Sequence, residues 1–328
     1  MAAFVWILVF IGTLAALVVS ADFFIKAAER VGLALGIEPF IIGVTLVALG
    51  TSLPELITSI VAVTLEGASS DIVLGNVVGS NVTNLCLVLG IVAIASRNIS
   101  LEFDPVRVDL PILIGSAFFL FLAVMDDKFS FFEAIVCLGG MTLYIAYVFK
   151  QGKEDADLNE VAVATSAPQK IVSDYQFSWK EPLTLVIAAA IIFLSARFNV
   201  ESIINLSTLY NIGEGFIALT AVALGTSLPE LVVSIVAVRT GNGEMAVGNV
   251  LGSNIFNVFA VMGIPRLFGK IELSSQAADI QFSLWTMVAA TLIGFFVLQD
   301  RKVLRWEGWL LIVIYVLFIG NLIDLQVQ

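Results

Sequence analysis

Residues 45–63 read TLVALGTSLPELITSIVAV, and residues 220–238 read TAVALGTSLPELVVSIVAV, so that sixteen of nineteen positions are identical. A second block follows each of them: GNVVGSNVTN at 75–84 and GNVLGSNIFN at 248–257, with seven of ten positions identical. Self-similarity of this kind indicates an internal duplication. The chain is therefore predicted to consist of two related halves.

The composition around these blocks is typical of a membrane protein. The 328 residues are 59% hydrophobic and 13% charged, with a mean hydropathy of +1.02, whereas soluble domains are about 45–50% apolar and about 25% charged. There is too little charge to cover the surface of a soluble core of this size. A net charge of −11 also argues against nucleic acid as a partner.

The predicted fold class is an all-α integral membrane protein with ten spans. A helix that crosses the hydrocarbon core needs about 20 largely apolar residues. Ten segments meet this criterion, at 3–27, 40–65, 71–95, 108–125, 130–150, 181–199, 214–238, 244–268, 280–299 and 306–325.

One extended polar stretch divides the chain. We predict a first five-helix repeat over 1–150, containing the block 45–84, and a second over 181–328, containing the block 220–257. The stretch 151–180 between them includes a run of acidic residues, and its composition favours a flexible linker.

The positive charges orient the spans. Twelve Lys and Arg residues fall on one side of the predicted spans and four on the other, and this bias puts the linker in the cytoplasm with both termini outside the cell membrane. Because each half has five spans, an odd number, matching segments enter the membrane from opposite sides. Such an inverted-topology repeat is common in secondary transporters.

The motif GTSLPE lies in the middle of an apolar span in each half. Pro54 lacks an N–H group and its ring collides with the carbonyl four residues back, so together with Gly50 it should break the helix. Pro229 and Gly225 repeat the arrangement. Irregular backbone at this depth occurs only where it lines a cavity or is packed in protein.

Glu55 and Glu230 are the only acidic residues predicted near mid-depth. A carboxylate there costs at least a few kcal/mol and by default marks an ion path; the alternative is a protonated acid that caps a broken helix. Thr51 precedes Glu55 by one turn, as Thr226 precedes Glu230, so each pair shares a helix face.

Hydroxyl and amide side chains surround these glutamates in the sequence. Hydroxyls in membrane helices often donate to the carbonyl of the preceding turn, and this alternative applies to the hydroxyls of both motifs. For the amides, ion coordination competes with hydrogen bonds between helices. The polar candidates are Thr51, Ser52, Ser80, Asn84, Thr226, Ser227, Ser253 and Asn257.

Together these groups form an all-oxygen set of ligands. Calcium takes six to eight oxygens in flexible geometry. The chain has no histidine, and its two cysteines lie in apolar stretches, so imidazole and thiolate sites for transition metals are excluded. We expect no resident cofactor, because the ions are substrates.

At these blocks the sequence resembles the sodium/calcium exchanger branch of the calcium/cation antiporter superfamily. GTSLPE followed by GSNVTN, and again by GSNIFN, is similar to the two α-repeats of that family, whereas its proton/calcium members carry GNATE in place of GTSLPE. The resemblance implies alternating access, with sodium entry driving calcium out. It implies calcium bound by Glu55 and Glu230 with the backbone carbonyls of Thr51 and Thr226. The sodium ligands it implies are Ala48, Thr51, Ser52, Ser80, Ala223, Thr226, Ser227 and Ser253.

Three other functions are considered. A proton/calcium antiporter could use the same two glutamates, because carboxylates at mid-depth can titrate, and a channel is a further alternative. An intramembrane enzyme is not expected, because no histidine or mid-span lysine could serve as its base, and no obligate protein partner is evident. Potassium-dependent relatives often carry aspartate at the position of Asn257, so its amide predicts exchange without potassium.

Overall fold

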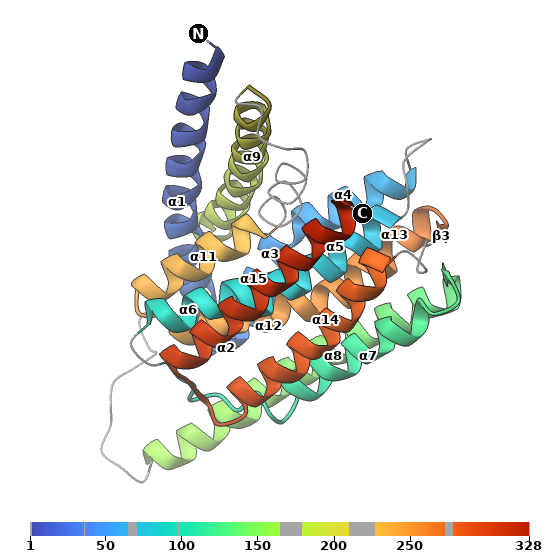
Figure 1. Ribbon diagram of the computed structural model, residues 1–328. Helices are drawn as coiled ribbons and strands as arrows, with labels where there is room; N and C mark the ends of the chain where they lie inside the picture. Colours follow the sequence, from blue (N-terminus) through green and yellow to red (C-terminus); the bar gives the residue numbers. More distant parts are fainter. Residues whose placement is uncertain are drawn as a thin grey trace.

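The computed structural model describes residues 2–35, 37–64, 71–96, 99–164, 179–209, 227–272 and 278–327. The described part is mostly helical (Figure 1). The helices of the first half are α1 (Ala2–Leu35), α2 (Pro39–Ile42), η1 (Gly43–Val47), α3 (Ala48–Thr51), α4 (Leu53–Thr64), α5 (Asp71–Val82), η2 (Thr83–Val88), α6 (Leu89–Ala95), α7 (Asp109–Ala123) and α8 (Phe131–Ala164). Those of the second half are α9 (Lys180–Leu209), α11 (Leu228–Arg239), α12 (Gly243–Phe256), η3 (Asn257–Val261), α13 (Met262–Phe268), α14 (Ala278–Leu298) and α15 (Arg305–Val327).

Seven described helical stretches are long and apolar enough to cross a membrane, and the protein is a multi-pass membrane protein. They are Ala3–Gly32, Ile72–Ala95, Phe131–Lys150, Lys180–Phe198, Gly243–Phe268, Ile280–Leu298 and Arg305–Asp324. An eighth span is the bent pair Pro39–Thr51 and Leu53–Thr64. These eight lie within a few residues of predicted spans.

The two remaining predicted spans have a different outcome. The segment predicted at 108–125 forms α7, which has only 15 residues, fewer than the roughly 20 that a perpendicular crossing needs. The segment predicted at 214–238 is described only from residue 227, so its first half lies outside the described residues.

The predicted helix break lies at Ser52. The axis of the span bends there by 41°. Ser52 itself has φ −89° and ψ 5°, which is not a helical conformation. Ser227, its counterpart in the second half, has nearly the same backbone, with φ −93° and ψ 7°. Both motifs therefore place a serine at the turn and start a new helix with Leu-Pro-Glu, as the proline requires.

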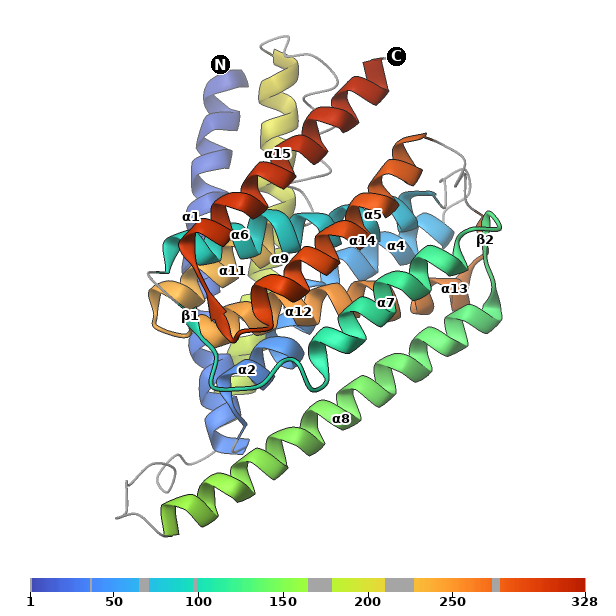
Figure 2. The same cartoon turned by 60° about the horizontal axis from the view of Figure 1, so that its bottom comes forward.

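The spans that carry the second repeated block form the centre of the bundle. Within the spanning windows, 78% of Ile72–Ala95 and 89% of Gly243–Phe268 is buried, against 11–39% for the other five. Both contain a π-helical stretch, η2 and η3, at matching positions; such stretches are frequent at functional sites. By contrast, α1 and α9 lie side by side (Figures 1 and 2) and project from one side of the bundle in Figure 1.

Glycine allows α12 to pack backbone to backbone against η1. A Cβ atom on Gly248 would lie 2.4 Å from the carbonyl oxygen of Phe40, and one on Gly252 would lie 2.4 Å from that of Val44. Close helix packing therefore accounts for both glycines of the second half. For Gly75 and Gly79 of the first half, no described atom lies within 4 Å of such a Cβ, so the structure gives them no close contact.

Two short strand pairs, which the sequence did not predict, join the halves. Strand β1 (Ile99–Ser100) pairs antiparallel with β4 (Lys302–Val303), and β2 (Lys128–Phe129) pairs antiparallel with β3 (Ile271–Glu272). Strands β1 and β3 occupy matching places in the two repeats. Figure 2 shows β1 and β2 at opposite ends of the bundle, and β3 pairs with β2, so β1 and β3 also lie at opposite ends.

The expectation of a flexible linker over 151–180 is wrong for its first half. Helix α8 continues without interruption from the membrane span to Ala164, as the long helix in Figure 2 shows. Residues 165–178 of this segment lie outside the described residues. Lys, Glu, Asp and Ala are compatible with helix, so the polar composition marked the end of the membrane span rather than the end of the helix.

Candidate ion-binding site

Two buried glutamates lie at the centre of the candidate site. Glu55 is in the first turn of α4 and Glu230 in the first turn of α11, each three residues after the serine that precedes the helix. They are 1% and 0% exposed and close enough to repel each other when charged. Among the described residues, both carboxylate oxygens of Glu55 and Oε2 of Glu230 have no hydrogen-bond partner.

Buried carboxylate oxygens without donors are costly, since a buried charge needs a counter-charge or hydrogen bonds. Within the described part of the chain, no Lys or Arg forms an ion pair with either glutamate. Nor do three or more His, Cys, Asp or Glu side chains gather there. The arrangement is therefore one of two carboxylates with neutral oxygens around them, which suits a hard cation.

Ser52 connects the two halves at this point. Its hydroxyl donates to Oε1 of Glu230 at 3.2 Å, across 178 positions of sequence. The corresponding hydroxyl of Ser227 is buried and has no hydrogen-bond partner among the described residues. The side chain of Ser52 therefore faces the second half of the chain.

Thr51 has several acceptors within reach. Its hydroxyl lies 3.2 Å from the carbonyl oxygen of Val47 and 3.3 Å from that of Ala48, the alternative expected for membrane hydroxyls. It also lies 3.2 Å from Oδ1 of Asn249 and 3.5 Å from Oγ of Ser253. One hydroxyl has one proton, so these contacts are alternatives, and Thr51 lies between its own helix and α12.

Two asparagines that the sequence analysis did not select brace the broken helices. Nδ2 of Asn76 donates to the backbone carbonyl of Glu55 and to Oγ of Ser59, both at 3.1 Å. Nδ2 of Asn249 donates to Oγ of Ser234 at 2.9 Å. Asn76 and Asn249 are the first asparagines of the two GNVxGSN motifs, so their recurrence was the signal that could have identified them.

The amides predicted as ligands are both fully buried, and they differ. Asn257 donates from Nδ2 to Oδ1 of Asn81 at 3.1 Å, which is the interhelical bond considered as the alternative, while its Oδ1 has no partner. For Asn84, neither amide atom has a hydrogen-bond partner among the described residues.

Ten of the twelve predicted site residues are described, and all ten are buried. Contacts bring together Ser52 with Glu230 and Thr51 with Ser253, while Glu55 lies near Glu230. Ala48, Ser80, Asn84, Ser227 and Asn257 are buried on the same repeated segments. Ala223 and Thr226 lie outside the described residues.

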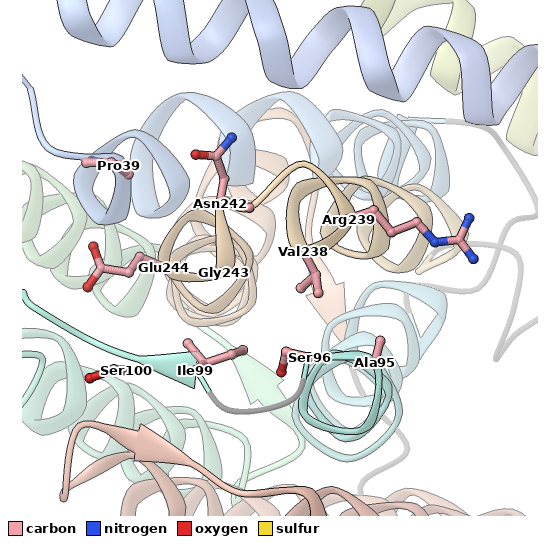
Figure 3. A pocket seen from close by; sticks show the side chains of 11 residues that line it. Pro39, Ala95, Ser96, Ile99, Ser100, Val238, Arg239, Asn242, Gly243 and Glu244 are labelled. Atoms are coloured by element: carbon pink, nitrogen blue, oxygen red, sulfur yellow. The ribbon is translucent and has the colours of Figure 1, made fainter.

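A pocket of about 450 Å³ lies away from these residues, where α11 ends and α12 begins. Figure 3 shows its lining, with Arg239, Asn242 and Glu244 on one side and Ser96 and Ile99 on the other. None of the twelve predicted site residues lines it.

The fold and the site define a class of protein: a multi-pass helical membrane protein in which broken helices bury two glutamates among amide and hydroxyl oxygens. Residues 5–150 and 180–323 match the family described as sodium/calcium exchanger protein. The chain belongs to the sodium/calcium exchanger family, a branch of the calcium/cation antiporter superfamily.

Individual relatives agree with this family. The chain is 35% identical to the sodium/calcium exchanger MaX1 of Methanosarcina acetivorans, over 92% of this chain and 94% of that protein. It is 32% identical to the putative antiporter CaxA of Alkalimonas amylolytica, over 92% and 93%. A solved structure of the sodium-calcium exchanger NCX_Mj superposes with a TM-score of 0.78 at 26% identity, over 97% of this chain and 98% of that one.

Proposed function

We propose that the protein is a secondary active antiporter that exchanges sodium for calcium by alternating access, and that it normally extrudes calcium as sodium enters. The observation that carries this proposal is the pair Glu55 and Glu230. One comes from each half, both are buried, and three of their four oxygens lack a donor among the described residues.

The coupling follows from the charge of that pair. Two carboxylates in a site without water repel each other, and moving them unoccupied through a low-dielectric barrier is costly. One Ca²⁺ or two Na⁺ cancel the charge, so either cargo permits the transition, and the empty site disfavours it. Competition between the two ions for the same carboxylates then produces exchange.

The ligand assignment rests on the burial of the described candidates and on the family. Calcium would be held by Glu55 and Glu230 with the backbone carbonyls of Thr51 and Thr226. The groups proposed for sodium are Ala48, Thr51, Ser52, Ser80, Ala223, Thr226, Ser227 and Ser253, and those proposed for further coordination, direct or through water, are Asn84 and Asn257.

The proposed architecture is ten membrane helices in two inverted repeats, 1–150 and 181–328, joined by a cytoplasmic connection at 151–180, with both termini outside the cell membrane. Support for the inversion comes from β1 and β3, which match in sequence position and lie at opposite ends of the bundle. Support for the orientation comes from the distribution of Lys and Arg.

The test is calcium-45 uptake into proteoliposomes loaded with sodium. Uptake should require the outward sodium gradient and should persist when choline replaces potassium on both sides. Uptake driven by a pH gradient without sodium would instead establish the proton/calcium antiporter. A requirement for added potassium would contradict the expectation drawn from the neutral amide of Asn257.

A further inference from the structure

Asn81 links the two halves of the chain, although it was not among the predicted site residues. It lies in α5, one residue after Ser80, and is 3% exposed. Its Nδ2 lies 3.3 Å from the backbone carbonyl oxygen of Asn254, and its Oδ1 accepts from Nδ2 of Asn257 at 3.1 Å. Both partners belong to the second half of the chain.

The chemistry of these partners fixes which way both amides point. A backbone carbonyl only accepts hydrogen bonds, so the nitrogen of Asn81 must face Asn254. The thioether of Met287, a weak acceptor, lies 3.8 Å from the same nitrogen and favours the same orientation. Oδ1 of Asn81 therefore faces Asn257, which can meet it only with its own nitrogen.

Because Nδ2 of Asn257 faces Asn81, Oδ1 of Asn257 points away from Asn81. This oxygen is buried and has no hydrogen-bond partner among the described residues. Asn257 begins η3, and η3 contacts α4, whose first turn carries Glu55. The bond to Asn81 thus turns an acceptor oxygen of Asn257 away from α5 and leaves it available to a cation.

The matching residues of the other half do not repeat this arrangement. Nδ2 of Asn254, the counterpart of Asn81, donates to the carbonyl of Val250 in its own helix at 2.6 Å. Asn84, the counterpart of Asn257, has no hydrogen-bond partner at either amide atom among the described residues. Asn254 therefore provides a matched comparison for Asn81.

We propose that Asn81 is a positioning residue of the ion site: it holds the amide of Asn257 so that a neutral oxygen, and not the NH₂ group, faces the bound cation. This inference rests on the proposed function. It also explains why an amide suits position 257 here, since a carboxylate there would meet the oxygen of Asn81 with no proton between them.

The test is a double-mutant cycle on calcium affinity, measured by titration calorimetry on the purified full chain in detergent. Asn81→Ala and Asn257→Ala should each weaken calcium binding by about tenfold, and the double variant by about tenfold as well, because Asn81 acts through Asn257. A double variant weakened by about one hundredfold would mean independent effects and would overturn the assignment.

Two further variants keep the result interpretable. If Asn81→Ala fails to fold, Asn81→Leu, which fills a similar volume, replaces it in the same cycle. Asn254→Ala should change calcium affinity by less than about twofold, because its side chain bonds within its own helix; a loss equal to that of Asn81→Ala would overturn the specific role of Asn81. Wild-type protein that binds no calcium would instead refute the proposed function itself.

Discussion

The segments around Glu55 and Glu230 have almost the same sequence and different surroundings. Glu230 accepts a hydrogen bond from Ser52, whereas both oxygens of Glu55 lack a partner among the described residues. The difference arises because the hydroxyl that reaches Glu230 comes from the other half, so the hydrogen bond depends on how the halves lie against each other. A duplicated sequence therefore supplies two equivalent sets of candidate ligands, whose contacts differ in this conformation.

The largest expected effect is the loss of either charge. Glu55→Gln and Glu230→Gln should each abolish calcium exchange, although their neighbours differ, because each removes one of two charges that offset the dehydration of Ca²⁺. A unit charge about 4 Å away at an effective dielectric near 20 is worth about 4 kcal/mol, or roughly a thousandfold in affinity. Calorimetry measures the loss of calcium affinity, and calcium-45 flux measures the loss of exchange.

Asp109 provides the control for this experiment. It is another fully buried acid, but it lies outside the repeated blocks and accepts a hydrogen bond from Tyr144 at 2.8 Å. Asp109→Asn should keep calcium binding near wild type. If one of the glutamate variants transported at the wild-type rate, that residue would not belong to the calcium site, and the comparison between the two segments would lose its meaning.

The next effect concerns the glycines of α12. Gly248→Ala and Gly252→Ala should lower the free energy of unfolding by about 1–3 kcal/mol, the usual cost of overpacking, because each new Cβ would collide with a backbone carbonyl of the first half. The loss is read as a lower melting temperature in detergent. Gly75→Ala should change the melting temperature little, because no described atom lies within 4 Å of its Cβ position. A decrease as large as that of Gly248→Ala would contradict this comparison.

A smaller effect should separate the two serines. Ser52→Ala removes the hydrogen bond to Glu230, and bonds to charged groups contribute about 1.5–3 kcal/mol, so calcium affinity should fall roughly tenfold or more. Ser227→Ala removes a hydroxyl without a partner among the described residues and should have the weaker effect. Equal losses of calcium affinity would show that both serines contact the ion. The difference between their hydrogen bonds would then belong to one conformational state of the protein.

The smallest effect is expected outside the membrane. Deleting ten residues, 155–164, shortens the helical extension of α8 without touching its spanning part, Phe131–Lys150. Sodium-driven calcium uptake should stay within about twofold of wild type, because the remaining connection still reaches α9 as a tether. Loss of uptake with normal insertion would show that this segment does more than connect the halves.

Much of the fold and of the candidate site could be predicted from the sequence, because the strongest signals are local. Long apolar runs predicted eight of the ten expected spans to within a few residues, and the proline of GTSLPE predicted the helix break that lies at Ser52. Burial of the ten described candidates followed from polar residues repeated within apolar helices. Each of these depends on a property of a single segment.

What the sequence did not provide depends on contacts between segments. Which hydroxyl reaches a carboxylate depends on how the halves meet, and the hydroxyl of Ser52 donates to Glu230 of the other half. Asn76 and Asn81 were not predicted as site residues because their hydrogen-bond partners lie on other helices. Two-residue strands such as β1 carry no pattern, since a period of two cannot be recognised in two residues.

The strand pairs have a consequence for biosynthesis. Ile99 pairs with Val303, and Phe129 with Ile271, so neither pair can close until the second half has emerged from the ribosome. At about 5–20 residues per second, the strand around Ile99 waits roughly 10–40 s for its partner. The nascent first half therefore remains in the membrane during that time with its strand edges and its half of the glutamate pair uncovered, and its maturation is coupled to the insertion of the last two helices.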